Sequence, residues 1–245
     1  DTLSLHDALP ISAAAVRAAI ASAYHSQVAE YLEIHPKNPQ ARLMRRAADI
    51  VREGGVIAYP TDSCYALGCH VGDADALERI RRIRQADKNH HFTLVCRDLS
   101  EIARYARVEN WQYRLLKAHT PGPYTFILEA TREVPRIIQT KRKTIGIRVP
   151  KHAVVQALTK ALGRPIISTT AARHGAEPLI DPTEIRDEFP GLAMVLDAGA
   201  GGLQPTSVVD LTTTPPQVLR VGAGPVDEFV LGDDGVPVSR RGVRF

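Results

Sequence analysis

The sequence predicts an α/β protein built on a mixed β-sheet, and three observations support this class. Short apolar runs that suit strands alternate with amphipathic stretches that suit helices through most of the chain. Near the C-terminal end, further apolar runs follow one another without a helix between them. With 245 residues, 44% of them hydrophobic, the chain is long enough to bury one large core.

In the first half of the chain, helices are indicated by apolar stripes and by capping residues. The first has one apolar stripe and stops at Gly54-Gly55. Acidic or amide side chains suit the N-termini of the other three. These four helices are expected to open at Pro39, Asp73, Asp98 and Asn110. The strands expected between them are Val56–Tyr59, which ends at Pro60, and Phe92–Cys96.

The second half is expected to hold two helices and six strands. Ala153–Leu162 is apolar on one face and ends at Gly163, and Asp181-Pro182 combines an N-cap with proline at the first helical position. The strands are runs of branched and aromatic residues. They are expected at Thr125–Ala130, Thr144–Val149, Pro165–Thr169, Ala193–Leu196, Ser207–Leu211 and Gln217–Val221.

The two ends of the chain differ in character from its centre. The first twelve residues, DTLSLHDALPIS, resemble translated sequencing-adapter read-through, and residues 13–30 read as a weak Ala-rich helix or a disordered arm. Residues 1–30 are therefore expected to be a non-native or disordered arm. Residues 224–245, rich in Gly and Asp, are expected to form a loose tail. One domain is expected over residues 31–223.

Composition and motifs exclude several classes of protein. Three cysteines are too few for a disulfide scaffold and suit a reducing cytosol, so a cytoplasmic protein is expected. No apolar run approaches the roughly 18 residues of a membrane span, so no membrane association is expected. P-loop and nucleophile-elbow motifs are absent, and Gly199, Gly201 and Gly202 have the wrong spacing for a dinucleotide-binding loop. No metal site is expected, because no further ligand completes a set with His90-His91 and Cys96.

The positive charge is concentrated in two segments. The net charge is only +4, but Arg79–Arg97 holds six Lys/Arg against one acid, and Arg132–Lys151 holds seven against one. Such segments either meet in one cleft that attracts anions or form two separate solvated faces. The charge pattern by itself leaves both alternatives open.

Hydroxyl side chains gather where predicted strands begin or end, and open α/β sheets bind ligands at the carboxyl ends of their strands. Thr61 and Ser63 follow the strand Val56–Tyr59, and Thr125 opens a strand after Pro-Gly-Pro. Three more hydroxyls, Ser168-Thr169-Thr170, end a buried strand. The alternatives are an ordinary side-chain-stabilised turn at Thr61–Ser63 and buried strand threonines elsewhere.

Arg82 and Arg84 are candidates to bind phosphate, with Lys88 and His90-His91 close behind them. Guanidinium groups bind phosphate and carboxylate in bidentate geometry. Residues two apart point to different faces of a helix but to the same side of an extended segment. If both arginines bind one phosphate chain, the helix must end by about Arg82. Alternatively, they serve as favourable charges at a helix C-terminus.

Seven phrases occur in a fixed order along the chain: GGVIAYPTDSCYALG, RIRQADKNHHFTLVCRDLSEI, TPGPYTFILEA, KRKTIGIRVP, IISTTA, QPTSVVDL and VLRVGAG. The stretch from about Ile34 to Gly222 thereby resembles the YrdC/YciO threonylcarbamoyl-adenylate synthase family, most closely its YciO branch. The resemblance implies a twisted mixed β-sheet with helices around a large basic cavity.

The same resemblance implies an activity. Members of the family condense L-threonine, bicarbonate and ATP to threonylcarbamoyl-AMP and pyrophosphate, and Mg²⁺ usually accompanies ATP in such reactions. A partner enzyme then transfers the carbamoyl group of this product to adenosine of certain tRNAs. The alternative function is binding of double-stranded RNA or tRNA through the basic cavity, without synthase turnover.

The resemblance also assigns site residues. The catalytic positions are Arg82 and Arg84. The nucleotide-binding positions are Arg84, Thr125, Arg148, Thr170 and Arg220. The amino-acid-binding positions are Thr61, Ser63, Arg97 and Thr206.

Four positions depart from the synthase pattern. Arg82 stands where the family has Lys, which keeps the charge and changes the shape and hydration of the group. Arg97 stands in place of a His, Glu129 in place of a basic residue and Ala172 in place of an Asn. The resemblance is therefore closer on the nucleotide side of the pocket than on the threonine side.

Overall fold

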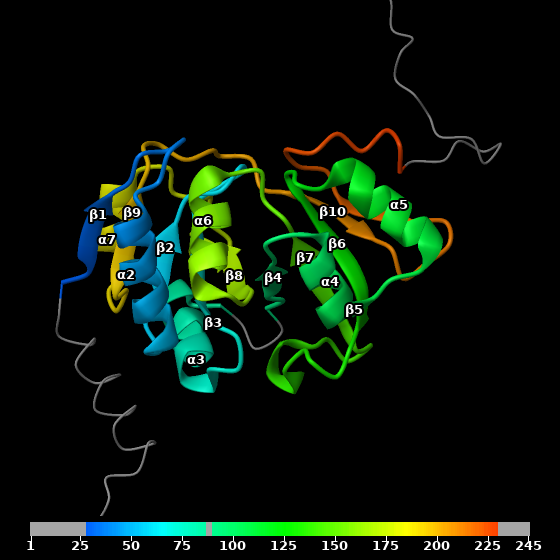
Figure 1. The fold of residues 1–245 in the computed structure, drawn as a ribbon, viewed down its shortest axis with the longest axis horizontal. Coiled ribbons are helices and arrows are strands. Elements are labelled where there is room, and N and C mark those ends of the chain that lie inside the picture. Colours follow the sequence, from blue (N-terminus) through cyan, green and yellow to red (C-terminus); the bar gives the residue numbers. More distant parts are fainter. Residues whose placement is uncertain (1–27, 87–89, 230–245) are drawn as a thin grey trace, which may run out of the picture.

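The structure is a computed structural model that describes residues 28–86 and 90–229. Lys88, most of the expected N-terminal arm and most of the expected C-terminal tail lie outside the described residues. Figure 1 shows the described part as a curved sheet with helices packed along it.

One mixed sheet runs through the described part of the chain, in the order β1-β9-β2-β3-β8-β4-β7-β6-β10-β11, and β5 pairs with β6 beside this path. The strands are β1 (Glu30–Glu33), β2 (Ile57–Tyr59), β3 (Ala66–His70), β4 (Thr93–Val95), β5 (Ala106–Arg107), β6 (Tyr124–Ala130), β7 (Thr144–Arg148), β8 (Ile166–Thr170), β9 (Met194–Asp197), β10 (Ser207–Asp210) and β11 (Gln217–Arg220). The predicted α/β class with a mixed sheet is confirmed.

The helices begin close to their predicted capping residues. Asp73, Asp98 and Asp181 each accept a hydrogen bond from a backbone N–H of the first turn, which satisfies a donor that the helix itself leaves unpaired. The helices are α2 (Ala41–Arg52), α3 (Ala74–Arg84), α4 (Leu99–Tyr105), α5 (Asn110–His119), α6 (Ala153–Leu162) and α7 (Pro182–Glu188), with a 3₁₀ turn at Arg136–Ile138.

Alternation along the strands separates two packed layers. Ile57 and Tyr59 of β2 pack in the cluster beneath α2 and α6, whereas Ala58 between them packs in the cluster on the other side. In β6, Phe126 belongs to the core cluster that contains α4 and α5 residues, and its neighbour Thr125 lines a cavity. Figure 1 shows α2 and α6 over one half of the sheet and α4 and α5 over the other.

Three strands escape the sequence prediction, namely β1, β3 and the two-residue β5, which pairs with β6. β1 pairs in parallel with β9 and begins at Glu30. The arm expected over residues 1–30 therefore includes one residue that belongs to the sheet. β3 lies in a segment for which no strand is predicted, and it pairs with both β2 and β8. Residues 66–69 of β3 are all buried, so no polar alternation marks them as a strand.

The expected tail boundary at residue 223 also changes. The Tyr124 hydroxyl donates to the Pro225 carbonyl at 2.9 Å, and Ser207 Oγ donates to the Gly224 carbonyl. Phe229 is buried in the main core cluster. Residues 224–229 are therefore packed against the domain rather than loose.

Alkaline pH is expected to weaken the fold partly through Tyr59. Burial raises the pKa of Tyr59 to about 12, and its hydroxyl donates to Ser168 Oγ at 2.6 Å. Above its ordinary pKa of about 10, the unfolded chain releases this proton while the folded chain keeps it, so the free energy of unfolding falls as pH rises from 10 to 12. Tyr59→Phe is expected to be about 1 kcal/mol less stable at neutral pH.

That deficit of Tyr59→Phe is expected to shrink between pH 10 and 12, because the variant cannot release this proton. Urea unfolding of both proteins at steps across this range would measure it. A deficit that stays constant across the range would show that Tyr59 does not contribute to the alkaline loss of stability.

Candidate functional site

A cavity of about 940 Å³ lies over one face of the sheet, between the C-terminal end of α3 and the loop of residues 136–142. The register of five strands sets one row of its floor. Gly146 of β7 pairs with Thr93 of β4 and with Ile127 of β6, and these pair in turn with Ser168 of β8 and Asp210 of β10. All five residues line the cavity. A Cβ at Gly146 would lie 3.1 Å from the Thr125 methyl group, so glycine avoids a tight contact at this point of the cavity floor.

Positive charge dominates the cavity wall. Among the described residues that line it, six carry a positive charge and one, Asp210, carries a carboxylate. The six are Arg81, Arg84, Lys141, Arg142, Arg148 and Arg220. They come from both basic segments of the sequence, with Arg220 added from β11, so the two segments meet in one cavity. Such a concentration of charge favours an anionic ligand.

Arg84 is held rigidly at the end of α3. Its Nε donates to the Ala172 carbonyl at 2.6 Å, and its Nη1 donates to Thr169 Oγ1 at 2.6 Å. Nη1 also lies 2.6 Å from His90 Nε2. A guanidinium can only donate, so His90 Nε2 is the acceptor in this contact. Burial lowers the pKa of Arg84 to about 10, which leaves the group charged at neutral pH.

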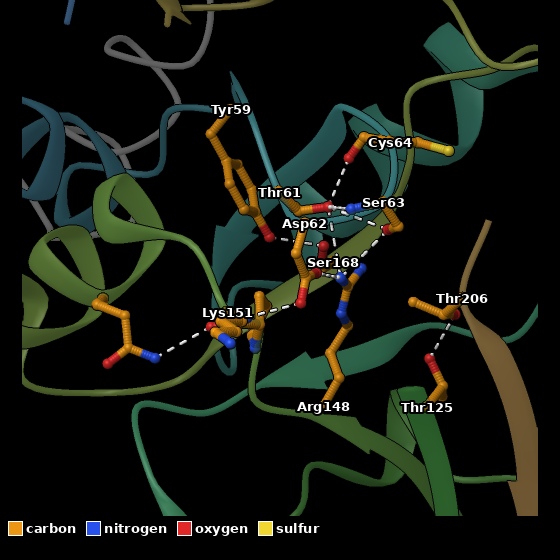
Figure 2. Close-up of polar contacts among 12 residues, drawn as sticks. Tyr59, Thr61, Asp62, Ser63, Cys64, Thr125, Arg148, Lys151, Ser168 and Thr206 are labelled. Atoms are coloured by element: carbon orange, nitrogen blue, oxygen red, sulfur yellow. Dashed lines mark hydrogen bonds and ion pairs between the residues drawn. The ribbon is translucent and has the colours of Figure 1, made fainter. Parts of the chain in front are cut away.

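Arg148, at the end of β7, is bound by the turn between β2 and β3. Its Nη2 donates to Asp62 Oδ1 at 2.6 Å, to Ser63 Oγ at 3.2 Å and to Thr61 Oγ1 at 3.3 Å (Figure 2). Thr61 Oγ1 in turn donates to the Cys64 carbonyl at 2.6 Å. The side-chain-stabilised turn and the site therefore use the same hydroxyls.

A third group joins β6, β10 and β11. The hydroxyls of Thr125 and Thr206 lie 2.9 Å apart and both side chains are buried (Figure 2). Arg220 donates from Nε to the Thr206 carbonyl at 2.9 Å and from Nη2 to Thr206 Oγ1 at 3.1 Å. Burial lowers the pKa of Arg220. This group places two hydroxyls and one cation on the same wall of the cavity.

Most of the residues predicted from the sequence come together here. Those that line the cavity are Arg84, Thr125, Arg148, Thr170, Thr206 and Arg220. Thr61 and Ser63 do not line it themselves and reach it through Arg148.

Arg82 and Arg97 are not among the lining residues, which corrects their expected positions. Helix α3 continues to Arg84 rather than ending by Arg82, so Arg82 points to another side, whereas Arg81 shares the face of Arg84. Arg97 is exposed beyond β4, where its Nε donates to Asp98 at 2.7 Å. Glu129 is likewise exposed and pairs with Arg107 at 2.9 Å.

Several lining residues escape the sequence analysis as site candidates, among them Arg81, Thr144 and Asp210. Arg81 could have been found from the helical spacing of three residues to Arg84. Asp210 could have been found from strand alternation, because it lies four residues after the predicted site residue Thr206. Thr206, Val208 and Asp210 all line the cavity.

Two other kinds of feature are absent from the described residues. They contain no group of three or more His, Cys, Asp or Glu side chains that could hold a metal ion. In the same part of the chain, no helix has the length and apolar character needed to span a bilayer.

Comparison with known proteins places this cavity in a wider context. The family model Sua5_yciO_yrdC, described as "Telomere recombination", matches residues 49–222. The Escherichia coli (strain K12) protein YciO, described as uncharacterized, is 51% identical over 206 residues, which cover 83% of this chain and all of YciO. The crystal structure of E. coli YciO gives a TM-score of 0.80 over 82% of this chain and all of that chain, at 50% identity.

Two more distant relatives carry a described activity or ligand. The threonylcarbamoyl-AMP synthase of Chromobacterium violaceum is 34% identical over 178 residues, 72% of this chain and 92% of the synthase. The crystal structure of P. abyssi Sua5 complexed with L-threonine gives a TM-score of 0.76 at 27% identity, over 81% of this chain and 59% of that chain.

Proposed function

Because this chain belongs to the Sua5/YciO/YrdC family, we propose that it is a threonylcarbamoyl-AMP synthase-like enzyme. Its proposed reaction condenses L-threonine, bicarbonate and ATP to threonylcarbamoyl-AMP and pyrophosphate. The synthase relative and the threonine complex of P. abyssi Sua5 support this choice of substrates. The proposed location of the protein is the cytoplasm.

The observation that carries the proposal is the cavity wall, where buried arginines and hydroxyls converge. Threonine's amine attacks bicarbonate to give a carbamate and water. A carbamate oxygen then attacks the α-phosphorus of ATP, and pyrophosphate leaves. Both steps depend on holding anions in line and offsetting their charge, rather than on a covalent nucleophile. Six positive side chains in one cavity suit that task.

The proposed roles follow the geometry. Arg84, fixed by Thr169 and the Ala172 carbonyl, would offset charge on the phosphates. Thr125, Thr206, Thr170 and Arg220 would hold the nucleotide. The turn with Thr61 and Ser63 would face the amino-acid side through Arg148.

Mg²⁺ would accompany the nucleotide. It prefers oxygen ligands and is usually held by one or two carboxylates together with substrate phosphates. Asp210 is the one carboxylate among the described lining residues, and its Oδ1 already accepts from Thr212 N and Oγ1 at 2.8 and 2.6 Å. Asp210 is therefore the residue that would hold the ion, and the ion would neutralise phosphate charge.

The decisive experiment measures pyrophosphate release from ATP and bicarbonate, with and without L-threonine, on the protein starting near Ala29. Release that requires both threonine and bicarbonate is the expected result. ATP binding without such turnover would contradict threonine as the substrate. If neither occurs, binding of double-stranded RNA or tRNA becomes the favoured function, and its affinity would fall steeply with salt. A partner enzyme would use the product to modify tRNA.

A further inference from the structure

We propose that Asp62 is a positioning residue, which fixes the guanidinium of Arg148 so that it presents its remaining donors to an oxyanion of the substrate. Asp62 does not line the cavity and would act only through Arg148. The inference rests on the proposed function for the identity of that oxyanion, which is a phosphate of ATP or the carboxylate of threonine.

The Asp62 carboxylate makes two short bonds in opposite directions. Oδ1 accepts from Arg148 Nη2 at 2.6 Å, and Oδ2 accepts from the backbone N–H of Lys151 at 2.6 Å. Lys151 directly precedes His152, the N-cap residue of α6. Figure 2 shows the carboxylate between the two donors. One side chain thereby ties the β2–β3 turn, the end of β7 and the approach to α6 together.

This ion pair differs from the other pairs of the described structure in its burial. The side chains of Arg148 and Asp62 are 9% and 10% exposed, whereas every other acid–base pair of the described residues has at least one partner above 40%. Exposed pairs contribute little, because water screens them. A buried carboxylate instead leaves an unbalanced charge when its partner is removed.

The remaining face of Arg148 points to a ligand. All of its hydrogen bonds within the described residues converge on Nη2. Its Nε is buried and has no partner there, although Arg148 lines the cavity. Buried donors in folded proteins are nearly always paired. The guanidinium therefore keeps unpaired donors, and these are the groups that a substrate oxygen would meet.

Arg148 needs a fixed partner to stay in this position. Arginine is long and loses substantial rotamer freedom when it is ordered. Burial lowers the pKa of Arg220, and the nearby charge of Arg148 lowers it further. The two guanidinium groups therefore repel each other. Thr61 and Ser63 offer only neutral hydroxyls at 3.2–3.3 Å. Asp62 supplies the opposite charge that these contacts lack.

The test compares Asp62→Asn, Asp62→Glu and the control Asp49→Asn. Asp49 also pairs with an arginine at 2.6 Å, but both partners are exposed on α2. ATP, inorganic pyrophosphate and L-threonine are titrated separately by calorimetry. Because hydrogen bonds to charged groups are worth about 1.5–3 kcal/mol, we expect Asp62→Asn to weaken the ligand on Arg148 by about tenfold to a hundredfold. Asp62→Glu should recover part of this affinity, and Asp49→Asn should match the wild type.

A second readout separates positioning from stability. In ¹⁵N NMR, the Arg148 Nε–H signal should be sharp in the wild type, and it should broaden or exchange rapidly in Asp62→Asn because the guanidinium becomes mobile. Weaker ATP and pyrophosphate binding would identify a phosphate as the oxyanion, and weaker threonine binding would identify a carboxylate.

Two results would overturn the inference: an Asp62→Asn protein that loses melting temperature while retaining wild-type affinities and a sharp Arg148 signal, or a wild type that binds none of the three probes. The proposed synthase function can fail separately. If pyrophosphate binds and depends on Asp62 while threonine-dependent turnover is absent, Asp62 still positions Arg148 and only the reaction is refuted.

Discussion

Arg84→Ala is expected to reduce threonine-dependent pyrophosphate release by at least about a hundredfold, the loss typical of removing one preorganised donor to a developing charge. Arg84 lines the cavity, and three contacts hold its guanidinium, to Thr169, His90 and the Ala172 carbonyl. The variant also leaves the Ala172 carbonyl without this donor. We therefore expect a lower melting temperature as well, from about 1–3 kcal/mol of lost stability.

Arg82→Ala is the matched comparison, since it removes the same side chain two residues earlier on α3. Arg82 is not among the lining residues, so this variant is expected to keep most of the turnover. Steady-state kinetics and thermal melting of both variants would decide the matter. The opposite order, with Arg82→Ala inactive and Arg84→Ala active, would contradict the orientation of α3 described above.

Gly202→Ala is expected to destabilise the protein by about 3 kcal/mol, at the upper end of the usual cost of overpacking. A Cβ at Gly202 would lie 1.9 Å from the Ser63 carbonyl oxygen and 3.1 Å from its carbonyl carbon. Both contacts are with backbone, so no side-chain rotation relieves them. The Thr61–Ser63 turn must move, and the contacts of its hydroxyls with Arg148 would move with it.

The control for this prediction is Gly175→Ala. Gly175 has a φ of +74°, and a Cβ at this position would have no neighbouring atom within 4 Å, so only the backbone preference is lost, at about 1–2 kcal/mol. Urea unfolding would measure both variants, and ATP titration would show whether Gly202→Ala alone weakens binding. Equal losses of stability would mean that the contact with Ser63 is readily relieved.

Local patterns are enough to predict most elements of this chain. Ala153–Leu162 is a helix with the predicted bounds, because its apolar stripe and Gly163 act within the segment itself. The N-caps at Asp73, Asp98 and Asp181 are confirmed for the same reason. β3 escapes prediction because a strand buried on both faces has no alternation, and only its pairing with β2 and β8 defines it.

The candidate site is predictable in its members and less so in its geometry. Thr125, Arg148, Thr206 and Arg220 are assigned from ordered phrases of sequence, and the structure brings all four into one cavity. The choice between Arg81 and Arg82 depends on where α3 ends, and the sequence leaves that point open. The spacing of Gly202 excludes a dinucleotide-binding loop and says nothing of its close contact with Ser63, which joins segments far apart in the chain.

The physical reason for this division is the range of the interactions involved. Periodicity, caps and turn residues act over a few neighbours, so the order of elements and the family resemblance can be read along the chain. The cavity floor instead depends on register across five strands, and the position of Arg148 depends on Asp62, 86 residues away. Those contacts exist only once the sheet has assembled.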